Sequence, residues 1–241
     1  MPTATEPTLW RRFRSWLEEY YPDLRPRVRA TPGWSGNGMV ATLNGTGFMF
    51  ERRDRFADAF IEYAGSVGRP VLEIGAAYGV STIPALERGA IITASDLDPR
   101  HLEILQGKVR PDLLPRLTLK PGKLPDIDFP LNHYAAILCS RVLHFLTGEE
   151  VDASVRNMAR WLAPGGRLAI LEFTRPPSAL VRGWMSFWNR FIMDPLGRLI
   201  SGQGDAYKYL PESVARFPDG PTLASLMTET GFTEVTYRYF D

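Results

Sequence analysis

A turn of small residues and an acidic residue follow two successive apolar runs, and together they have the chemistry to hold a nucleoside. The first run, Val71–Ile74, leads into the turn Gly75–Gly79. Small residues let the backbone pass close to a ligand, and the N–H groups of the turn are expected to face its carboxylate or phosphate. The second run, Ile91–Ala94, is followed by Asp96, where a nucleoside-binding fold places an acid that accepts hydrogen bonds from ribose hydroxyls.

The glycine turn alone is a weak signal, because ordinary strand-to-helix turns also use small residues, and Asp96 supplies the support. A nicotinamide-binding turn would carry another glycine at position 82, where Thr82 stands. A second acid, Asp98, precedes Pro99 and is more simply explained as the N-cap of a helix.

Short aliphatic runs alternate with helical segments from Pro70 to about Phe173. This alternation predicts an α/β fold, with a Rossmann-like, doubly wound and mainly parallel sheet covered by helices on both faces. The predicted strands are 71–74, 91–94, 117–119, 135–138 and 168–172, and the predicted helices are 79–88, 99–107 and 149–162.

One domain, 1–241, is predicted, with an N-terminal helical and loop cap (1–69), a core (70–175) and a proline-rich, substrate-side insert with a final helix and strand (176–241). In the cap, helix 9–22 is basic and amphipathic, so it either docks on the core or forms a lid or a membrane-surface helix. The other expected elements are one or two short strands within 31–50, helix 53–64, an aromatic helix 180–193, helix 221–230 ending at Gly231, and strand 232–240.

Composition excludes several classes of protein. The 241 residues include 28 Lys+Arg, 27 Asp+Glu and 44% apolar residues, which argues against a disordered chain and a dedicated nucleic-acid binder. The single cysteine, Cys139, excludes an intrachain disulfide and a cysteine-based zinc site, and we expect it to be a buried strand residue. No metal site is predicted. The N-terminus lacks the layout of a signal peptide, so the expected location is the cytoplasm.

The core resembles the class I S-adenosylmethionine-dependent methyltransferases, which implies S-adenosylmethionine as the cofactor. The matching segments are Val71–Thr82, Ala94–Arg100, Phe129–Leu146 and Trp161–Leu168. The C-terminal third is similar to the ubiquinone/menaquinone biosynthesis C-methyltransferase family, in the order Leu171–Pro176, Leu196–Gly202, Ala206–Ser213, Arg216–Pro218 and Gly231–Phe232. That family methylates a ring carbon of a prenylated quinol.

The resemblance implies a set of residues for each ligand. The implied cofactor-binding residues are Glu73, Gly75, Ala76, Ala77, Tyr78, Gly79, Asp96, Leu97, Lys123, Leu124 and Ser140. Arg141, Tyr207 and Tyr209 are the candidate substrate-binding residues, although packing in the interior explains the two tyrosines equally well.

The chain departs from the family at several positions. Glu73 replaces an aspartate, Ala76–Tyr78 replaces a glycine-rich run, and Lys123–Leu124 replaces an Asn-Ala or Asp-Ala pair. The family also continues into a further strand after position 241. That strand is missing, truncated, or supplied by residues 39–50.

His144 stands where the family has an arginine thought to assist at the substrate ring. Since an imidazole titrates near neutral pH, His144 is the candidate catalytic base that removes the proton of a ring hydroxyl. The alternative is a hydrogen-bonded histidine that only shapes the substrate pocket. His101 and His133 are expected at the surface.

The sequence therefore predicts methyl transfer to a small aromatic or quinone-type acceptor, with ring C-methylation as the first choice. The alternatives are a natural-product O-, N- or C-methyltransferase and a non-catalytic, cofactor-binding relative. The expected partner is a small-molecule acceptor, which an apolar or prenylated compound would fit. Peripheral contact with a membrane is a further expectation, and no nucleic-acid partner is expected. The oligomeric state stays open.

Overall fold

The computed structural model describes residues 39–41, 43, 48–50, 53–174, 183, 214 and 216–239. The chain divides into two compact units, residues 1–52 and residues 53–241, so helix α2 (Arg55–Ser66) belongs with the core. The predicted helix 9–22 lies outside the described residues, and so does 180–193 apart from Gly183, which is helical. None of the described helices is long and apolar enough to cross a membrane.

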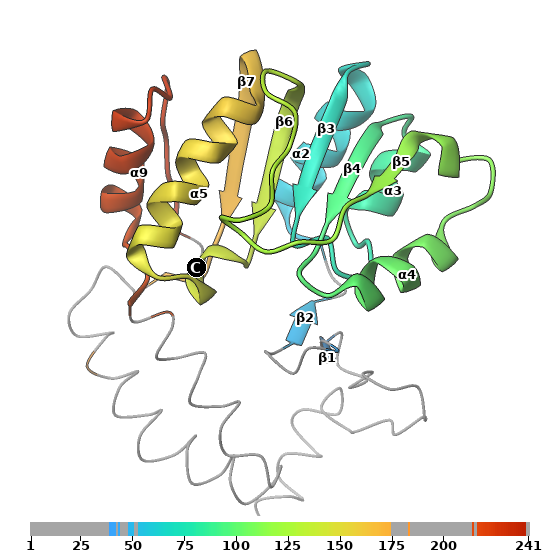
Figure 1. Cartoon of the computed structure of the whole chain (residues 1–241), viewed down its shortest axis with the longest axis horizontal. Coiled ribbons are helices and arrows are strands. Elements are labelled where there is room, and N and C mark those ends of the chain that lie inside the picture. The colour runs from blue at the N-terminus through green and yellow to red at the C-terminus, as the bar shows by residue number, and fades with distance from the viewer. Residues whose placement is uncertain are drawn as a thin grey trace, which may run out of the picture. The chain divides into compact units, whose positions relative to one another are not determined.

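The second unit is built on a five-stranded sheet in the order β5-β4-β3-β6-β7, with every strand parallel to its neighbours. This confirms the predicted Rossmann-like α/β fold. The strands are β3 (Pro70–Ile74), β4 (Ile91–Ser95), β5 (Leu117–Leu119), β6 (Tyr134–Ser140) and β7 (Leu162–Leu171). The order reverses between β3 and β6, and the carboxyl ends of β3, β6 and β7 point to one edge (Figure 1). Ligands of open parallel sheets bind at such an edge.

Helices cover both faces of this sheet. They are α2, α3 (Thr82–Glu87), α4 (Pro99–Lys108), α5 (Gly148–Trp161) and α9 (Gly220–Glu229), together with two short 3-10 helices, η2 (Leu114–Arg116) and η3 (Leu143–Phe145). Successive strand residues point to opposite faces, so Val71 packs in one apolar cluster with α2, α3 and α4, whereas Leu72 packs in the other with α5 and α9. Figure 1 shows α5 and α9 side by side on their face.

Local sequence signals set the helix ends. Asp98 caps α4, as predicted, because its carboxylate accepts the Arg100 N–H, and the Arg100 guanidinium holds the pKa of Asp98 at about 2. Helix α9 is followed by Gly231 at φ +101°, which confirms the predicted glycine C-cap.

The predicted last strand is wrong where it can be examined. Residues 232–239 make no strand after α9. Strands β1 (Met39–Ala41) and β2 (Phe48–Phe50) pair with each other as a separate antiparallel sheet, so residues 39–50 do not add a strand to the five-stranded one. The described residues therefore contain no strand after β7. Apolar residues within 232–240 did not suffice, because a strand also needs a neighbouring strand to pair with.

Candidate functional site

The turn after β3 adopts a conformation that favours glycine. Gly75 has φ +80°, and a side chain there would collide with Val142 and lie 2.9 Å from the Ser140 carbonyl oxygen. The turn thus packs directly against the loop that follows β6. Gly79 (φ +83°) and Ala77 (φ +42°) are also left-handed, so the turn is wound tightly into α3.

The N–H groups of this turn are used within the chain. The Gly75 and Ala76 N–H groups both donate to the Ser95 carbonyl oxygen, at 2.9 and 3.0 Å, and the Gly79 N–H donates to the Ala76 carbonyl oxygen at 2.8 Å. These three N–H groups therefore do not face a ligand carboxylate or phosphate as expected. The physical reason is that the turn folds back over the end of β4, whose carbonyl takes the donors.

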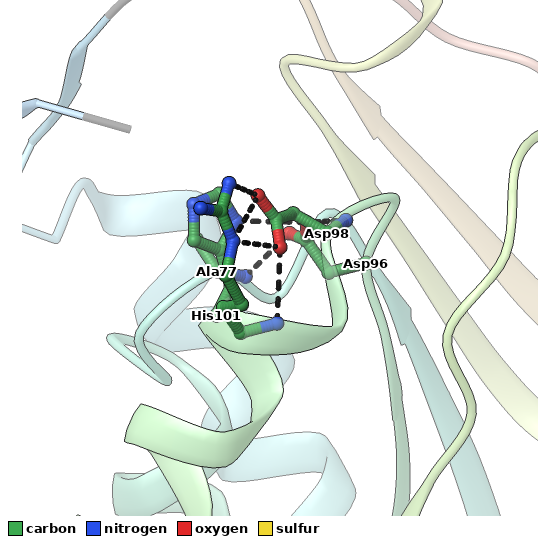
Figure 2. A network of polar contacts seen from close by, with 5 residues as sticks. Ala77, Asp96, Asp98 and His101 are labelled. Carbon is green, nitrogen blue, oxygen red and sulfur yellow. Dashed lines mark hydrogen bonds and ion pairs between the residues drawn. The ribbon is translucent and has the colours of Figure 1, made fainter. Parts of the chain in front are cut away.

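Asp96 joins β4 to the glycine turn (Figure 2). Its Oδ2 accepts the Ala77 N–H at 2.9 Å, and its Oδ1 accepts the Asp98 N–H at 3.0 Å. The His101 Nδ1 lies 2.9 Å from the same Oδ1 and donates to it, because an ionised carboxylate only accepts. Three of about four acceptor positions of this carboxylate are thus filled, and about one is left.

His101 is 1% exposed, which contradicts the surface position predicted for it. The first turn of α4 folds over the end of β4, so the imidazole is enclosed between Asp96 and the edge of the Tyr78 ring, 5.0 Å away between ring centroids. His133 is exposed, as predicted.

The Glu73 side chain is buried, 3% exposed, and packs under the glycine turn. The Thr82 hydroxyl donates to its Oε2 and ties β3 to the start of α3. Burial raises the pKa of Glu73 to about 7, against the lowering effect of hydrogen bonds from Thr82 and Ser81, and the Asp96 charge adds to the rise.

The segment after β5 reaches the same edge of the sheet. The Gly122 N–H donates to the Asp96 carbonyl oxygen at 2.9 Å, which brings Lys123 and Leu124 close to the end of β4. The Leu124 side chain is buried, and the Lys123 ammonium lies 3.0 Å from Glu150 Oε1, where the ion pair raises the pKa of Lys123. Leu97, by contrast, is 53% exposed beside Asp96.

Ser140 and Arg141 close the carboxyl end of β6. The Arg141 backbone has φ +57°, a left-handed conformation that costs free energy for a residue with a side chain, and its N–H donates to the Leu171 carbonyl oxygen at 2.7 Å. Its guanidinium lies 3.2 Å from Asp54 Oδ2 and 3.4 Å from the Ser140 hydroxyl oxygen. The same guanidinium carbon is 5.8 Å from the centre of the Phe173 ring.

A second carboxylate–histidine network follows the neighbouring strand. Glu172, directly after β7, accepts the Val142 and Leu143 N–H groups through Oε1, both at 2.6 Å, and its Oε2 lies 2.6 Å from His144 Nδ1. The His144 and Glu172 side chains are 1% and 3% exposed. The other ring nitrogen, His144 Nε2, is buried and has no hydrogen-bond partner among the residues that the structure describes.

The structure therefore brings the predicted residues into two clusters. Glu73, the glycine turn, Asp96 and Leu97 gather at the ends of β3 and β4, and Ser140, Arg141 and His144 gather after β6. Tyr207 and Tyr209 lie outside the described residues. No functional role was predicted for Glu172, Phe173 or His101. Glu172 and Phe173 were visible only as part of the run Leu171–Pro176, and no residue spacing pairs Glu172 with His144, because they come from different strands.

Residues 59–241 match the ubiE/COQ5 methyltransferase family. The ubiquinone/menaquinone biosynthesis C-methyltransferase UbiE of Pseudomonas putida strain F1 is 41% identical over 116 residues, which are 48% of this chain and 43% of that protein. The protein of the same name from Shewanella sp. strain ANA-3 is 31% identical over 152 residues, 63% of this chain and 59% of that protein. The chain thus spans about half the length of the curated relatives it matches.

The fold has solved counterparts. The structure of Haemonchus contortus phosphoethanolamine N-methyltransferase 2, in complex with phosphomonomethylethanolamine and S-adenosylhomocysteine, covers 74% of this chain and 37% of its own, with a TM-score of 0.56 and 16% sequence identity. At that identity the likeness concerns the fold alone. Since the family match covers well over half of the sequence, the chain belongs to the ubiE/COQ5 methyltransferase family.

Proposed function

We propose that this chain transfers the methyl group of S-adenosylmethionine to a ring carbon of a small aromatic, quinone-type acceptor. Family membership and the C-methyltransferase relatives of ubiquinone/menaquinone biosynthesis support this function. The observation that carries the proposal is the bond from the Ala77 N–H to Asp96, because it fixes a tight turn and an acid as one unit at the edge where the strand order reverses.

The residues at the ends of β3 and β4 fit the nucleoside part of the cofactor. Asp96 has about one acceptor position left, which suits one ribose hydroxyl. The exposed Leu97 side chain next to it offers an apolar surface that an adenine ring would cover. When bound, S-adenosylmethionine supplies a sulfonium methyl group that is ready for in-line displacement.

The residues after β6 and β7 fit an aromatic acceptor. Phe173 is 36% exposed, and its ring meets the buried His144 ring edge to face at 5.6 Å between centroids. An acceptor ring that stacks on Phe173 would place a hydroxyl group near His144, and the Arg141 guanidinium beside the same ring is suited to a developing negative charge.

In this mechanism His144 Nε2 takes the proton of the acceptor hydroxyl, so that an N–H bond forms and the O–H bond breaks. The negative charge left on the oxygen would spread to the neighbouring ring carbon and make it the nucleophile for the methyl group that bound S-adenosylmethionine would supply. The methylated ring carbon would then lose its hydrogen as a proton to solvent, which restores the aromatic ring, and protonated His144 would return its proton to the oxygen. His144 and Arg141 thus prepare the acceptor, and Asp96 and the turn hold the donor.

A calorimetric titration and a mass assay test this proposal separately. Titration with S-adenosylmethionine should give binding heat, and incubation with labelled donor plus a prenylated hydroquinone or naphthoquinol, with and without detergent, should add one methyl group to a ring carbon. Absence of binding by the folded protein would overturn the cofactor assignment. Binding without transfer to any phenolic or quinol acceptor would overturn the enzyme assignment.

A second candidate is methyl transfer to a different small phenolic compound on the same scaffold. His144 favours it, because the resemblance described above implies an arginine at that position, and a changed group at the acceptor oxygen suits a changed acceptor. The same mass assay with a panel of phenolic small molecules distinguishes the two. The proposal for a prenylated acceptor includes a cytoplasmic location and peripheral contact with a membrane. Stimulation of turnover by lipid vesicles would test the membrane contact.

A further inference from the structure

The carboxylate of Glu172 lies inside the protein and takes part in three hydrogen bonds, with the Val142 and Leu143 N–H groups and with His144 Nδ1. Two backbone N–H groups, of Val142 and Leu143, donate to Oε1, which an ionised carboxylate accommodates best. Oε2 is then also an acceptor, so the hydrogen at the contact with His144 Nδ1 belongs to the imidazole.

This contact sets the tautomer of His144. When one nitrogen of a neutral imidazole carries the hydrogen, the other carries only a lone pair. With Nδ1–H donating to Glu172, the Nε2 atom of the neutral ring is a bare acceptor. Phe145 and Phe173 flank the ring, at 3.9 and 5.6 Å between centroids, and limit its rotation away from Glu172.

The bare Nε2 is buried without a partner among the described residues. A buried polar atom without a hydrogen bond costs free energy, and in native proteins such an atom calls for an explanation. An acceptor lone pair is satisfied by a donor. A hydroxyl group on the methyl acceptor is a donor that would satisfy it.

The loop that carries His144 also contacts the proposed cofactor turn. Val142, two residues before His144, occupies the space that a side chain at Gly75 would need. The same Val142 N–H is held by Glu172. One carboxylate thus sets both the path of the loop beside the turn and the orientation of the ring at its end.

We propose that Glu172 is a positioning residue that keeps His144 in the Nδ1–H tautomer, with Nε2 free to accept the proton of the acceptor hydroxyl. This inference rests on the proposed function, because it concerns the base of that same site. The charged and titratable groups around the pair are the Arg141 guanidinium over Phe173 and the Cys139 thiol. Burial raises the pKa of that thiol, and the Glu172 charge adds to the rise.

Nitrogen NMR of the protein labelled with ¹⁵N-histidine tests the tautomer without any substrate. The chain has three histidines, and the variants His144→Gln and His101→Gln assign the signals. At alkaline pH, where an ordinary imidazole is neutral, His144 should show a protonated Nδ1 and an unprotonated Nε2. A His144 signal protonated at Nε2 would overturn the proposal, and this result needs no variant of Glu172.

The variant Glu172→Gln sharpens the NMR test. Its amide oxygen must still accept the Val142 and Leu143 N–H groups, so the amide NH₂ faces His144 Nδ1 and the ring hydrogen should move to Nε2. The exposed Glu149→Gln is the matched control and should leave the His144 signals in place. An unchanged tautomer in folded Glu172→Gln would contradict the role of Glu172.

Proton transfer to Nε2 is tested with a phenolic acceptor and its methyl ether, which lacks the hydroxyl hydrogen. Turnover of the ether should be lower by about 10²-fold or more, and Glu172→Gln should lower kcat for the phenol while leaving the Kd for S-adenosylmethionine within about twofold. Equal turnover of phenol and ether would overturn the proton transfer. If no acceptor is methylated although the donor binds and the NMR result holds, the proposed function fails while the positioning of His144 stands.

Discussion

Two networks at the same edge of the sheet are built from the same kinds of group and differ at the second ring nitrogen of the histidine. Asp96 after β4 and Glu172 after β7 each accept two backbone N–H groups and one histidine Nδ1–H. In the first network the His101 ring is enclosed by α4 and Tyr78. In the second, the Nε2 atom of His144 is left without a partner among the described residues.

The difference indicates how the two networks divide the work. The first network holds the glycine turn against the segment after β4, and the Asp96 carboxylate keeps about one acceptor position for a ligand. The second network holds His144 in the same way, but the Nε2 atom of this ring has no donor among the described residues. A buried carboxylate–histidine pair is therefore no functional signal in itself, and the unpaired atom is what distinguishes the chemistry of the second network from the support given by the first.

The largest effect should follow removal of the base. We expect His144→Gln to lower kcat by about 10²–10⁴-fold, because glutamine can still donate to Glu172 but cannot take a proton. The Kd for S-adenosylmethionine should stay within about twofold. Steady-state kinetics with a phenolic acceptor and calorimetry with the donor measure the two quantities. The exposed His133→Gln is the matched control. If His144→Gln turns over as fast as the wild type, His144 is not the base and only shapes the substrate pocket.

Glu73 tests the first network through stability. Its pKa is raised from 4.5 to about 7, so the folded protein binds this proton more tightly than the unfolded chain. Stability is therefore greatest below pH 4.5 for this group and is lost as the pH rises from 4.5 through 7, by up to about 3 kcal/mol. In urea unfolding between pH 5 and 8, the wild type should lose stability relative to Glu73→Gln. A difference between the two proteins that does not change with pH would contradict the raised pKa.

The sequence predicted the fold well, since the five strands, the helices that alternate with them and the caps at Asp98 and Gly231 are local signals of period, length and capping. It located Asp96 and His144 by their places after strands. It did not predict their partners. The Glu172–His144 contact joins residues 28 positions apart, and His101 became buried because α4 folds onto the end of β4, so both depend on tertiary packing.

The ligand-binding capacity of the first network is tested at its carboxylate. Asp96→Asn places an NH₂ group against the Asp98 N–H or the Ala77 N–H and leaves a donor without an acceptor. We expect calorimetry to give a Kd for S-adenosylmethionine that is weaker by about 10- to 100-fold, as for loss of a hydrogen bond to a charged group. The exposed Asp126→Asn should bind like the wild type. An unaltered Kd in Asp96→Asn would remove Asp96 from the cofactor site.

The smallest effect is expected at His101, and it decides whether the two networks differ as proposed. His101→Gln keeps a donor within reach of Asp96 Oδ1, so the carboxylate should stay in place and the Kd for S-adenosylmethionine should rise by no more than about fivefold. At saturating donor, its kcat should fall far less than that of His144→Gln, because the same substitution removes a support in one network and a proton acceptor in the other. Equal losses of kcat would mean that both histidines only hold their loops, and the unpaired Nε2 of His144 would then carry no chemistry.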